Sequence, residues 1–169
     1  MENTNALKNN SITIQNELNW LSDLIDNRLG FFFSSEEDKQ FVSLSSPDLD
    51  KDTSNMAAFI KRDLSDDFER LLIIGAIAAN LFPEVYDRFL IKNKTLDKPY
   101  TEFGGRKNSD SNYFEPTLRT IVFIMYGSSI VHKIKLLNYF NFDHIFKQSK
   151  ILSLSQSTEP LELLDKTLK

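Results

Sequence analysis

Cysteine is absent from this chain of 169 residues. The absence excludes disulfide bonds, thiolate catalysis and every zinc site that uses a cysteine ligand, and it fits a reducing compartment. Histidine is scarce as well, since only His132 and His144 are present and neither belongs to an H-E-x-x-H motif. We therefore expect no metal site in this chain.

Long hydrophobic runs are also missing. A spanning helix needs about 18 or more consecutive apolar residues, whereas the longest candidate here is "LLIIGAIAANLF". The first residues, "MENTNALKNNS", are polar and lack the apolar centre of a secretory signal. The sequence predicts a cytoplasmic protein without a membrane span.

No strong excess of either charge exists. The net charge is −4, with residues 1–60 at −6 and residues 61–169 at +2. Binding to a polyanion requires clustered cations, so the overall charge argues against nucleic acid as a partner. A modest basic face in the second part of the chain remains compatible with these numbers.

Helical periodicity is the clearest pattern that is present. Ile14, Leu18, Leu21 and Ile25 recur at the spacing of one helix face, and Gly30 is a natural stop. Residues 1–10 are rich in asparagine and are expected to be disordered. Further helices are predicted at residues 56–64, 66–82, 83–90, 116–127 and 128–142.

Strand signals are short and few. The candidates are residues 40–44, "QFVSL", and a strand pair around residues 151–154. Residues 92–114 are predicted to form a long polar loop. The predicted fold class is mainly α with a small β-hairpin (α+β). We expect one helical domain over residues 11–158, with residues 159–169 beginning a linker.

Two segments resemble ligand loops without matching them. "GGRKNSDS" at residues 104–111 lacks the G-x-x-x-x-G-K-[ST] spacing of a phosphate loop, so a turn with solvated Arg106 and Lys107 is favoured. "DLDKD" at residues 48–52 suggests a calcium loop, but Thr53 and Phe59 stand where glycine and glutamate are needed. A solvated acidic turn is favoured there, and we find no catalytic constellation or cofactor motif.

The order of motifs in the second part resembles a known family. "LLIIGAIAANLFPEVYDRFL" is followed by Phe103-Gly104-Gly105, then by "FEPT" at residues 114–117 with Thr120, then by an apolar helix that ends at Gly127. This order is similar to the N-terminal domain that precedes the motor in bacterial AAA-plus ATPases encoded with phage-tail-like contractile injection systems. The resemblance covers residues 10–169, and Glu115 departs from it because the family usually has an apolar residue there.

That resemblance implies a winged-helix-like, non-catalytic domain that recruits a protein client. ATP and Mg²⁺ would belong to a motor module whose Walker motifs are expected beyond Lys169, and the full-length protein would assemble as a homo-hexamer through that module. On this interpretation nucleic acid is not the expected partner.

The long polar loop at residues 92–114 is the predicted partner-contact surface. Its candidate contact residues are Phe103, Gly104, Gly105, Arg106, Lys107 and Tyr113. Replacing Phe103 and Arg106 is expected to weaken partner capture with little change in melting temperature. In the alternative interpretation, the aromatic residues, Phe114 above all, pin the loop to the core.

Three other functions stay open. A winged-helix nucleic-acid binder would use Lys133, Lys135, Lys147 and Lys150. A stand-alone protein-interaction domain would have no motor attached. A free-standing enzyme has no motif in its favour.

Overall fold

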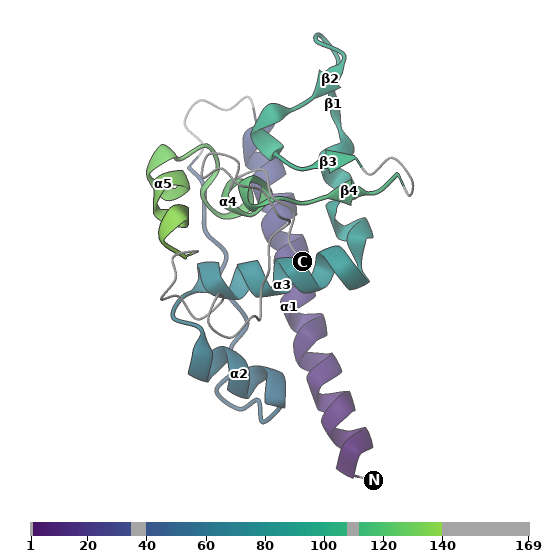
Figure 1. Ribbon diagram of the computed structural model, residues 1–169, viewed down its shortest axis with the longest axis vertical. Coiled ribbons are helices and arrows are strands. Elements are labelled where there is room, and N and C mark those ends of the chain that lie inside the picture. The colour runs from purple at the N-terminus through teal and green to yellow at the C-terminus, as the bar shows by residue number, and fades with distance from the viewer. Residues whose placement is uncertain (1, 35–39, 108–111, 140–169) are drawn as a thin grey trace. The chain divides into compact units, whose positions relative to one another are not determined.

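The computed structural model describes residues 2–34, 40–107 and 112–139, and the structural statements below concern these residues (Figure 1). The described chain is mainly helical with two small antiparallel hairpins, which confirms the predicted fold class. It divides into two compact units, Met1–Ile74 and Gly75–Lys169. The single winged-helix-like domain over residues 11–158 stays a prediction.

Helix α1 (Glu2–Phe32) carries the predicted apolar face. Leu18, Leu21 and Ile25 are buried, while Ile14 is half-buried. The helix begins at Glu2, so residues 2–10 are helical where we expected disorder. Asn10 supplies a physical reason, because its Oδ1 accepts a hydrogen bond of 3.0 Å from the backbone N–H of Met56 and ties this part of α1 to the next helix.

Two further helices of the first unit begin at side-chain caps. In α2 (Asn55–Asp63), Ser54 Oγ accepts from the N–H of Ala57 at 3.0 Å. At the start of α3 (Asp67–Leu81), Asp66 Oδ1 accepts from the N–H of Glu69 at 2.9 Å, and the Glu69 carboxylate accepts from the N–H of Ser65 at 2.7 Å. These two bonds form a capping box whose second bond is displaced by one residue, from Asp66 to Ser65. Residues 71–76, which are apolar throughout, are buried on every side of the helix.

The segment at residues 40–50, called the connecting segment below, is not a strand over residues 40–44, so that prediction is wrong. Its backbone carbonyls are bound by side chains of the helices instead of by a neighbouring strand. These bonds join Asn27 Nδ2 to Val42 O at 2.7 Å, Trp20 Nε1 to Leu44 O at 3.3 Å, and Arg70 Nη2 to Pro47 O at 2.8 Å.

A buried ion pair links α1 to α3 inside the first unit. The Glu17 side chain is fully buried and accepts two hydrogen bonds from the Arg70 guanidinium, one of them 2.7 Å long between Nε and Oε2. Arg70 Nη1 also donates to Ser46 Oγ at 3.0 Å. The pair is therefore fully hydrogen-bonded, which a buried charge requires.

The second unit places two hairpins between its helices (Figure 1). The second half of α3 leads through η1 (Pro83–Leu90) to the first hairpin, β1 (Lys92–Asn93) with β2 (Lys98–Pro99). After η2 (Thr101–Phe103) comes the second hairpin, β3 (Arg106–Lys107) with β4 (Phe114–Glu115). Helices α4 (Leu118–Tyr126) and α5 (Ile130–Tyr139) follow. Both hairpins lie in the predicted polar loop, and the strand pair expected at residues 151–154 lies outside the described residues.

Aromatic rings form the core of the second unit. The Phe89 ring centroid lies 5.3 Å from that of Phe103, 5.4 Å from that of Phe114 and 6.1 Å from that of Phe123. Tyr86 is also fully buried, and its hydroxyl donates to the Gly75 carbonyl at 2.9 Å. Burial raises the pKa of the Tyr86 hydroxyl far above its ordinary value, so this bond has a neutral donor. In the described part of the chain, no helix combines the length and apolarity that crossing a membrane requires.

Candidate functional site

Phe103, a candidate contact residue, is a core residue. Its side chain is only 1% exposed, and its ring lies 4.9 Å from Phe123 and 5.1 Å from Tyr100, centroid to centroid. A contact residue needs an exposed side chain, so the structure contradicts the choice of Phe103. Phe114 is also buried, at 4% exposure, which confirms the alternative that these aromatics pin the segment to the core.

Gly104 and Gly105 make a sharp turn against this core. Both have positive φ, at 64° and 68°, where side chains other than glycine are strained. A Cβ at Gly105 would lie 2.2 Å from the Phe114 ring and 2.7 Å from the Glu115 carbonyl oxygen. The Gly105 N–H also donates to Thr117 Oγ1 at 3.1 Å. The two glycines permit a close approach of the backbone to Phe114 and Glu115.

We predict that Gly105→Ala lowers the free energy of unfolding by about 2–4 kcal/mol, because overpacking adds to backbone strain. Gly30→Ala is the matched control. Gly30 lies inside α1 rather than ending it as predicted, and a Cβ there meets no atom within 4 Å. This control should be neutral or stabilising by about 0.5–1 kcal/mol. Chemical denaturation followed by circular dichroism measures both; equal effects of the two changes would contradict the packing argument.

Three other candidate contact residues have accessible side chains: Arg106, Lys107 and Tyr113. Arg106 and Lys107 are exposed on β3, and Tyr113 is half-buried just before β4. The Arg106 guanidinium lies 3.5 Å from the Glu115 carboxylate, across the hairpin. Of the candidate contact residues, these three can reach a partner through their side chains.

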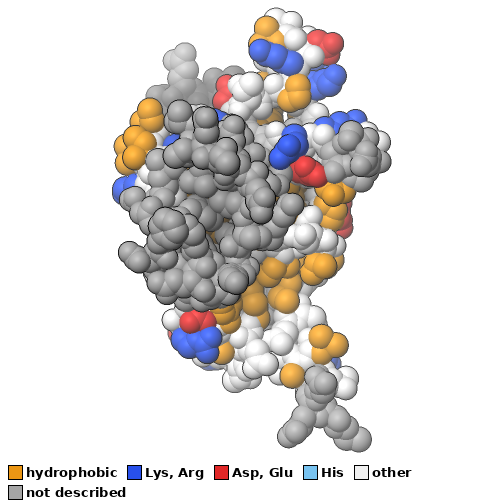
Figure 2. Space-filling model, viewed as in Figure 1, with side chains coloured by type: hydrophobic (Ala, Val, Ile, Leu, Met, Phe, Trp, Pro, Cys, Tyr) orange, Lys and Arg blue, Asp and Glu red, His pale blue; other side chains and the backbone are white. Residues whose placement is uncertain are grey.

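The turn between β1 and β2 adds three accessible residues to these candidates. Lys94 and Lys98 are exposed there, and Leu96 between them is 59% exposed. Figure 2 shows lysine and arginine side chains gathered over the two hairpins in the upper part of the view. We define the hairpin surface as Lys94, Leu96, Lys98, Arg106 and Lys107.

A signal for this turn is present in the sequence. Asparagine binds backbone N–H groups two residues ahead and favours turns. Asn93 does so here, since its Oδ1 accepts from the N–H groups of Thr95 at 2.9 Å and Leu96 at 3.2 Å. Asp97 completes the turn with a φ of 46°. The text "KNKTLDK" therefore contains a hairpin signal that loop length alone does not show.

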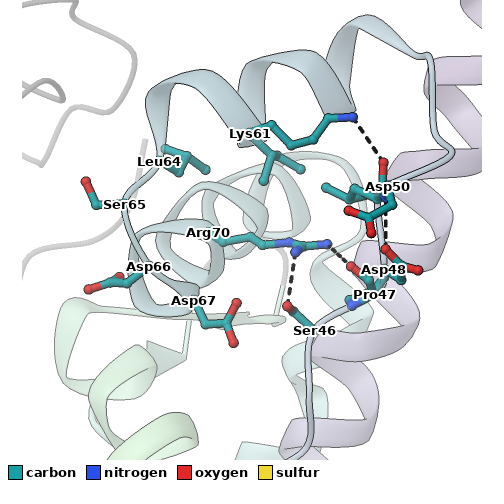
Figure 3. Close-up of a pocket in the computed structure, with 12 residues that line it drawn as sticks. Ser46, Pro47, Asp48, Asp50, Lys61, Leu64, Ser65, Asp66, Asp67 and Arg70 are labelled. Atoms are coloured by element: carbon teal, nitrogen blue, oxygen red, sulfur yellow. Dashed lines mark hydrogen bonds between the residues drawn. The ribbon is translucent and has the colours of Figure 1, made fainter.

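An open cleft of about 370 Å³ lies in the first unit (Figure 3). Arg70 reaches towards Ser46 and Pro47 within it, and Lys61 donates to the Leu49 carbonyl at 3.1 Å. The acidic side chains around it are Asp48, Asp50, Asp66 and Asp67. Asp48 accepts from the N–H of Asp50 at 2.8 Å, and Asp66 caps α3, so two of the four carboxylates have structural roles.

Asp52, expected in a solvated turn, is half-buried and hydrogen-bonded. Its Oδ2 accepts from Thr13 Oγ1 at 2.6 Å and its Oδ1 from the N–H of Ser54 at 2.8 Å. The Thr13 hydroxyl holds the pKa of Asp52 below its ordinary value of 3.8, with help from the bonds to Ser54.

This shift gives Asp52 a pH-dependent contribution to stability. The folded state binds the proton less readily than the unfolded state, so the contribution is present above pH 3.8 and is lost as the pH falls towards the folded pKa. We predict that Asp52→Asn reduces the loss of unfolding free energy between about pH 5 and about pH 3. Denaturation curves at both pH values test this, and an unchanged loss in the variant would contradict it.

His132 has a structural setting in α5. Its ring stacks on Tyr126 at 3.7 Å between centroids, and its Nδ1 lies 2.8 Å from Ser129 Oγ. His144 lies outside the described residues, as do Lys147 and Lys150. No group of three or more potential metal ligands occurs among the residues that the structure describes.

Comparison with known proteins gives no relative from which a role can be transferred: no family model, no curated protein and no solved structure matches this chain.

Proposed function

We propose that this chain is a non-catalytic recruitment domain that binds a protein partner through the hairpin surface. The observation that carries the proposal is the contrast within residues 92–115. Phe103 and Phe114 anchor the segment in the core, at 1% and 4% exposure, while Leu96 and the cations point outwards. An exposed segment that is anchored in a core is a suitable contact surface, because it loses less conformational entropy on binding than an unanchored one.

The finer proposal is that the domain serves a cytoplasmic AAA-plus motor of the contractile-injection type. It rests on the sequence resemblance, and several residues of that resemblance shape α4 and the turn before it. Thr117 and Thr120 make reciprocal capping bonds at the start of α4, Thr117 also binds Gly105, and Gly127 ends the helix with a φ of 61°. These residues explain the local geometry of the motif and do not themselves identify a client.

The reading frame beyond Lys169 tests the motor. A G-x-x-x-x-G-K-[ST] motif within about a hundred residues would support it, because the P-loop cradles nucleotide phosphates. A stop codon directly after Lys169 would remove the motor from the proposal and leave a stand-alone interaction domain.

Shortening the first hairpin tests recruitment. Replacing residues 94–97 with Asn-Gly closes the strands by a two-residue turn and removes the tip. We predict that an immobilised wild-type chain captures proteins from its source cells that the shortened chain does not. Quantitative mass spectrometry compares the two, with Gly30→Ala as a further control. If the shortened chain captures the same proteins in the same amounts, the hairpin surface is not the recruitment site.

A nucleic-acid binder is the second candidate, favoured by the exposed cations Lys94, Lys98, Lys107 and Lys135. Lys133, on the same helix as Lys135, is half-buried. A DNA complex made by these residues should weaken steeply as salt rises, with a slope set by the number of phosphates contacted. A DNA-binding assay titrated with salt measures that slope.

A further inference from the structure

We infer that the partner of the hairpin surface is an acidic protein segment carrying at least one large apolar side chain. This inference rests on the proposed recruitment function and names the chemistry of its partner. The apolar side chain would pack on Leu96, and the acidic side chains would face the surrounding lysines.

The presentation of Leu96 is the first observation. In the turn at residues 93–97, Asn93 Oδ1 accepts from the N–H groups of Thr95 and Leu96, so these two bonds order the turn from within. Leu96 is nevertheless 59% exposed at the tip, and neighbouring Ile91 is 46% exposed at the base of the hairpin. An apolar side chain held outwards by an ordered turn offers contact area to a partner at low entropic cost.

The charge of the hairpin surface is the second observation. Residues 92–107 contain five cations and two carboxylates, in a chain whose net charge is −4. Lys92 pairs with Asp97 at 3.7 Å and Arg106 with Glu115 at 3.5 Å. Lys94, Lys98 and Lys107 make no ion pair with any described residue. Complementary charge gives such a surface specificity for an acidic partner and a fast association rate.

The arrangement fits a protein better than a nucleic acid. A strand of nucleic acid needs a continuous cationic track and exposed rings for base stacking. Here Asp97 and Glu115 interrupt the cations, and the rings in this segment are buried or half-buried. The exposed apolar group is an aliphatic leucine, which suits a protein side chain.

Fluorescence anisotropy with defined probes tests the inference on the full chain. The probes are a labelled twelve-residue peptide of glutamate and leucine, the same peptide with glutamine for glutamate, and a mixed-sequence DNA duplex. The double variant Lys94→Glu with Lys98→Glu should weaken binding of the acidic peptide about tenfold, and Leu96→Ser should weaken it about tenfold as well. Lys8→Glu with Lys51→Glu, which changes the net charge equally, should leave binding unchanged.

Three results would overturn the inference: equal affinity for the glutamine peptide, tighter binding of the DNA duplex, or hairpin variants that bind the acidic peptide like the wild type. The experiments distinguish a failure of this inference from a failure of the recruitment proposal. If the shortened hairpin loses cellular partners while the acidic peptide does not bind, recruitment stands and the acidic chemistry is wrong. If the shortened hairpin loses no partner, recruitment itself is wrong.

Discussion

Replacing Glu17 by alanine should lower the free energy of unfolding by about 3–5 kcal/mol, because it leaves the Arg70 guanidinium buried without its counter-charge. Glu17 is fully buried and accepts two hydrogen bonds from Arg70. The single tryptophan, Trp20, is buried in the same unit with its ring 5.6 Å from the guanidinium carbon, so its fluorescence reports this region directly. Denaturant unfolding followed by Trp20 emission measures the loss.

Two further variants separate the buried charge from general damage to α1. Asp23→Ala alters an exposed residue of the same helix and should change stability by less than about 0.5 kcal/mol. Replacing Glu17 and Arg70 together with methionine removes both charges. The loss of unfolding free energy in this double variant should be clearly smaller than the sum of the losses in the two single methionine variants. A strictly additive double variant would mean that the two side chains do not stabilise each other.

Replacing Phe103 by alanine should also lower the unfolding free energy by about 3–5 kcal/mol, through lost burial and the cavity left among the rings. The ring touches Phe89, Tyr100 and Phe123, with centroids 5.3, 5.1 and 4.9 Å away. Far-ultraviolet circular dichroism during chemical denaturation measures the change. This outcome is the opposite of the small effect on stability expected from the sequence.

Leu96→Ala provides the matched control for Phe103, because Leu96 belongs to the same unit and is largely exposed. It should change stability by less than about 0.5 kcal/mol. If Phe103→Ala changes the unfolding free energy as little as Leu96→Ala does, the ring is not packed as described. Phe103 would then be a candidate contact residue again.

The helices could be predicted because their signals are local. The face of Leu18, Leu21 and Ile25, the cap at Asp66 and the stop at Gly127 each depend on residues within a few positions. A local stop signal fails where the rest of the helix is stable enough to continue through it. Gly30 lies within a helix that continues to Phe32, because a single glycine costs a helix only about 1 kcal/mol.

Long-range contacts explain what the sequence could not show. Glu17 and Arg70 are 53 positions apart, and nothing near either residue marks it as buried. Residues 40–44 have a strand-like composition, yet no strand forms because side chains of the helices bind their carbonyls. The two hairpins have strands of only two residues each, too short for an alternating pattern to appear.

Loop length is the reason that the sequence offers for a contact surface at residues 92–114, and that surface stays a prediction. The sequence does not show which of its residues are accessible. Composition alone cannot separate Phe103, which is buried, from Leu96, which is exposed, because both are large and apolar. The separation depends on which side of the chain faces the Phe89 ring, and that is a property of the folded unit.

The way in which the connecting segment is held has an evolutionary consequence. Asn27, Trp20 and Arg70 bind its backbone carbonyls, and a carbonyl is present whatever amino acid occupies the position. Val42, 69% exposed, should therefore drift freely among homologues, and Leu44 should do so to a lesser degree, without loosening the attachment. Selection should instead act on the three donors, which lie far from the segment in sequence. Among homologues, the amino acids of the connecting segment should therefore vary, while the three donor side chains should be conserved.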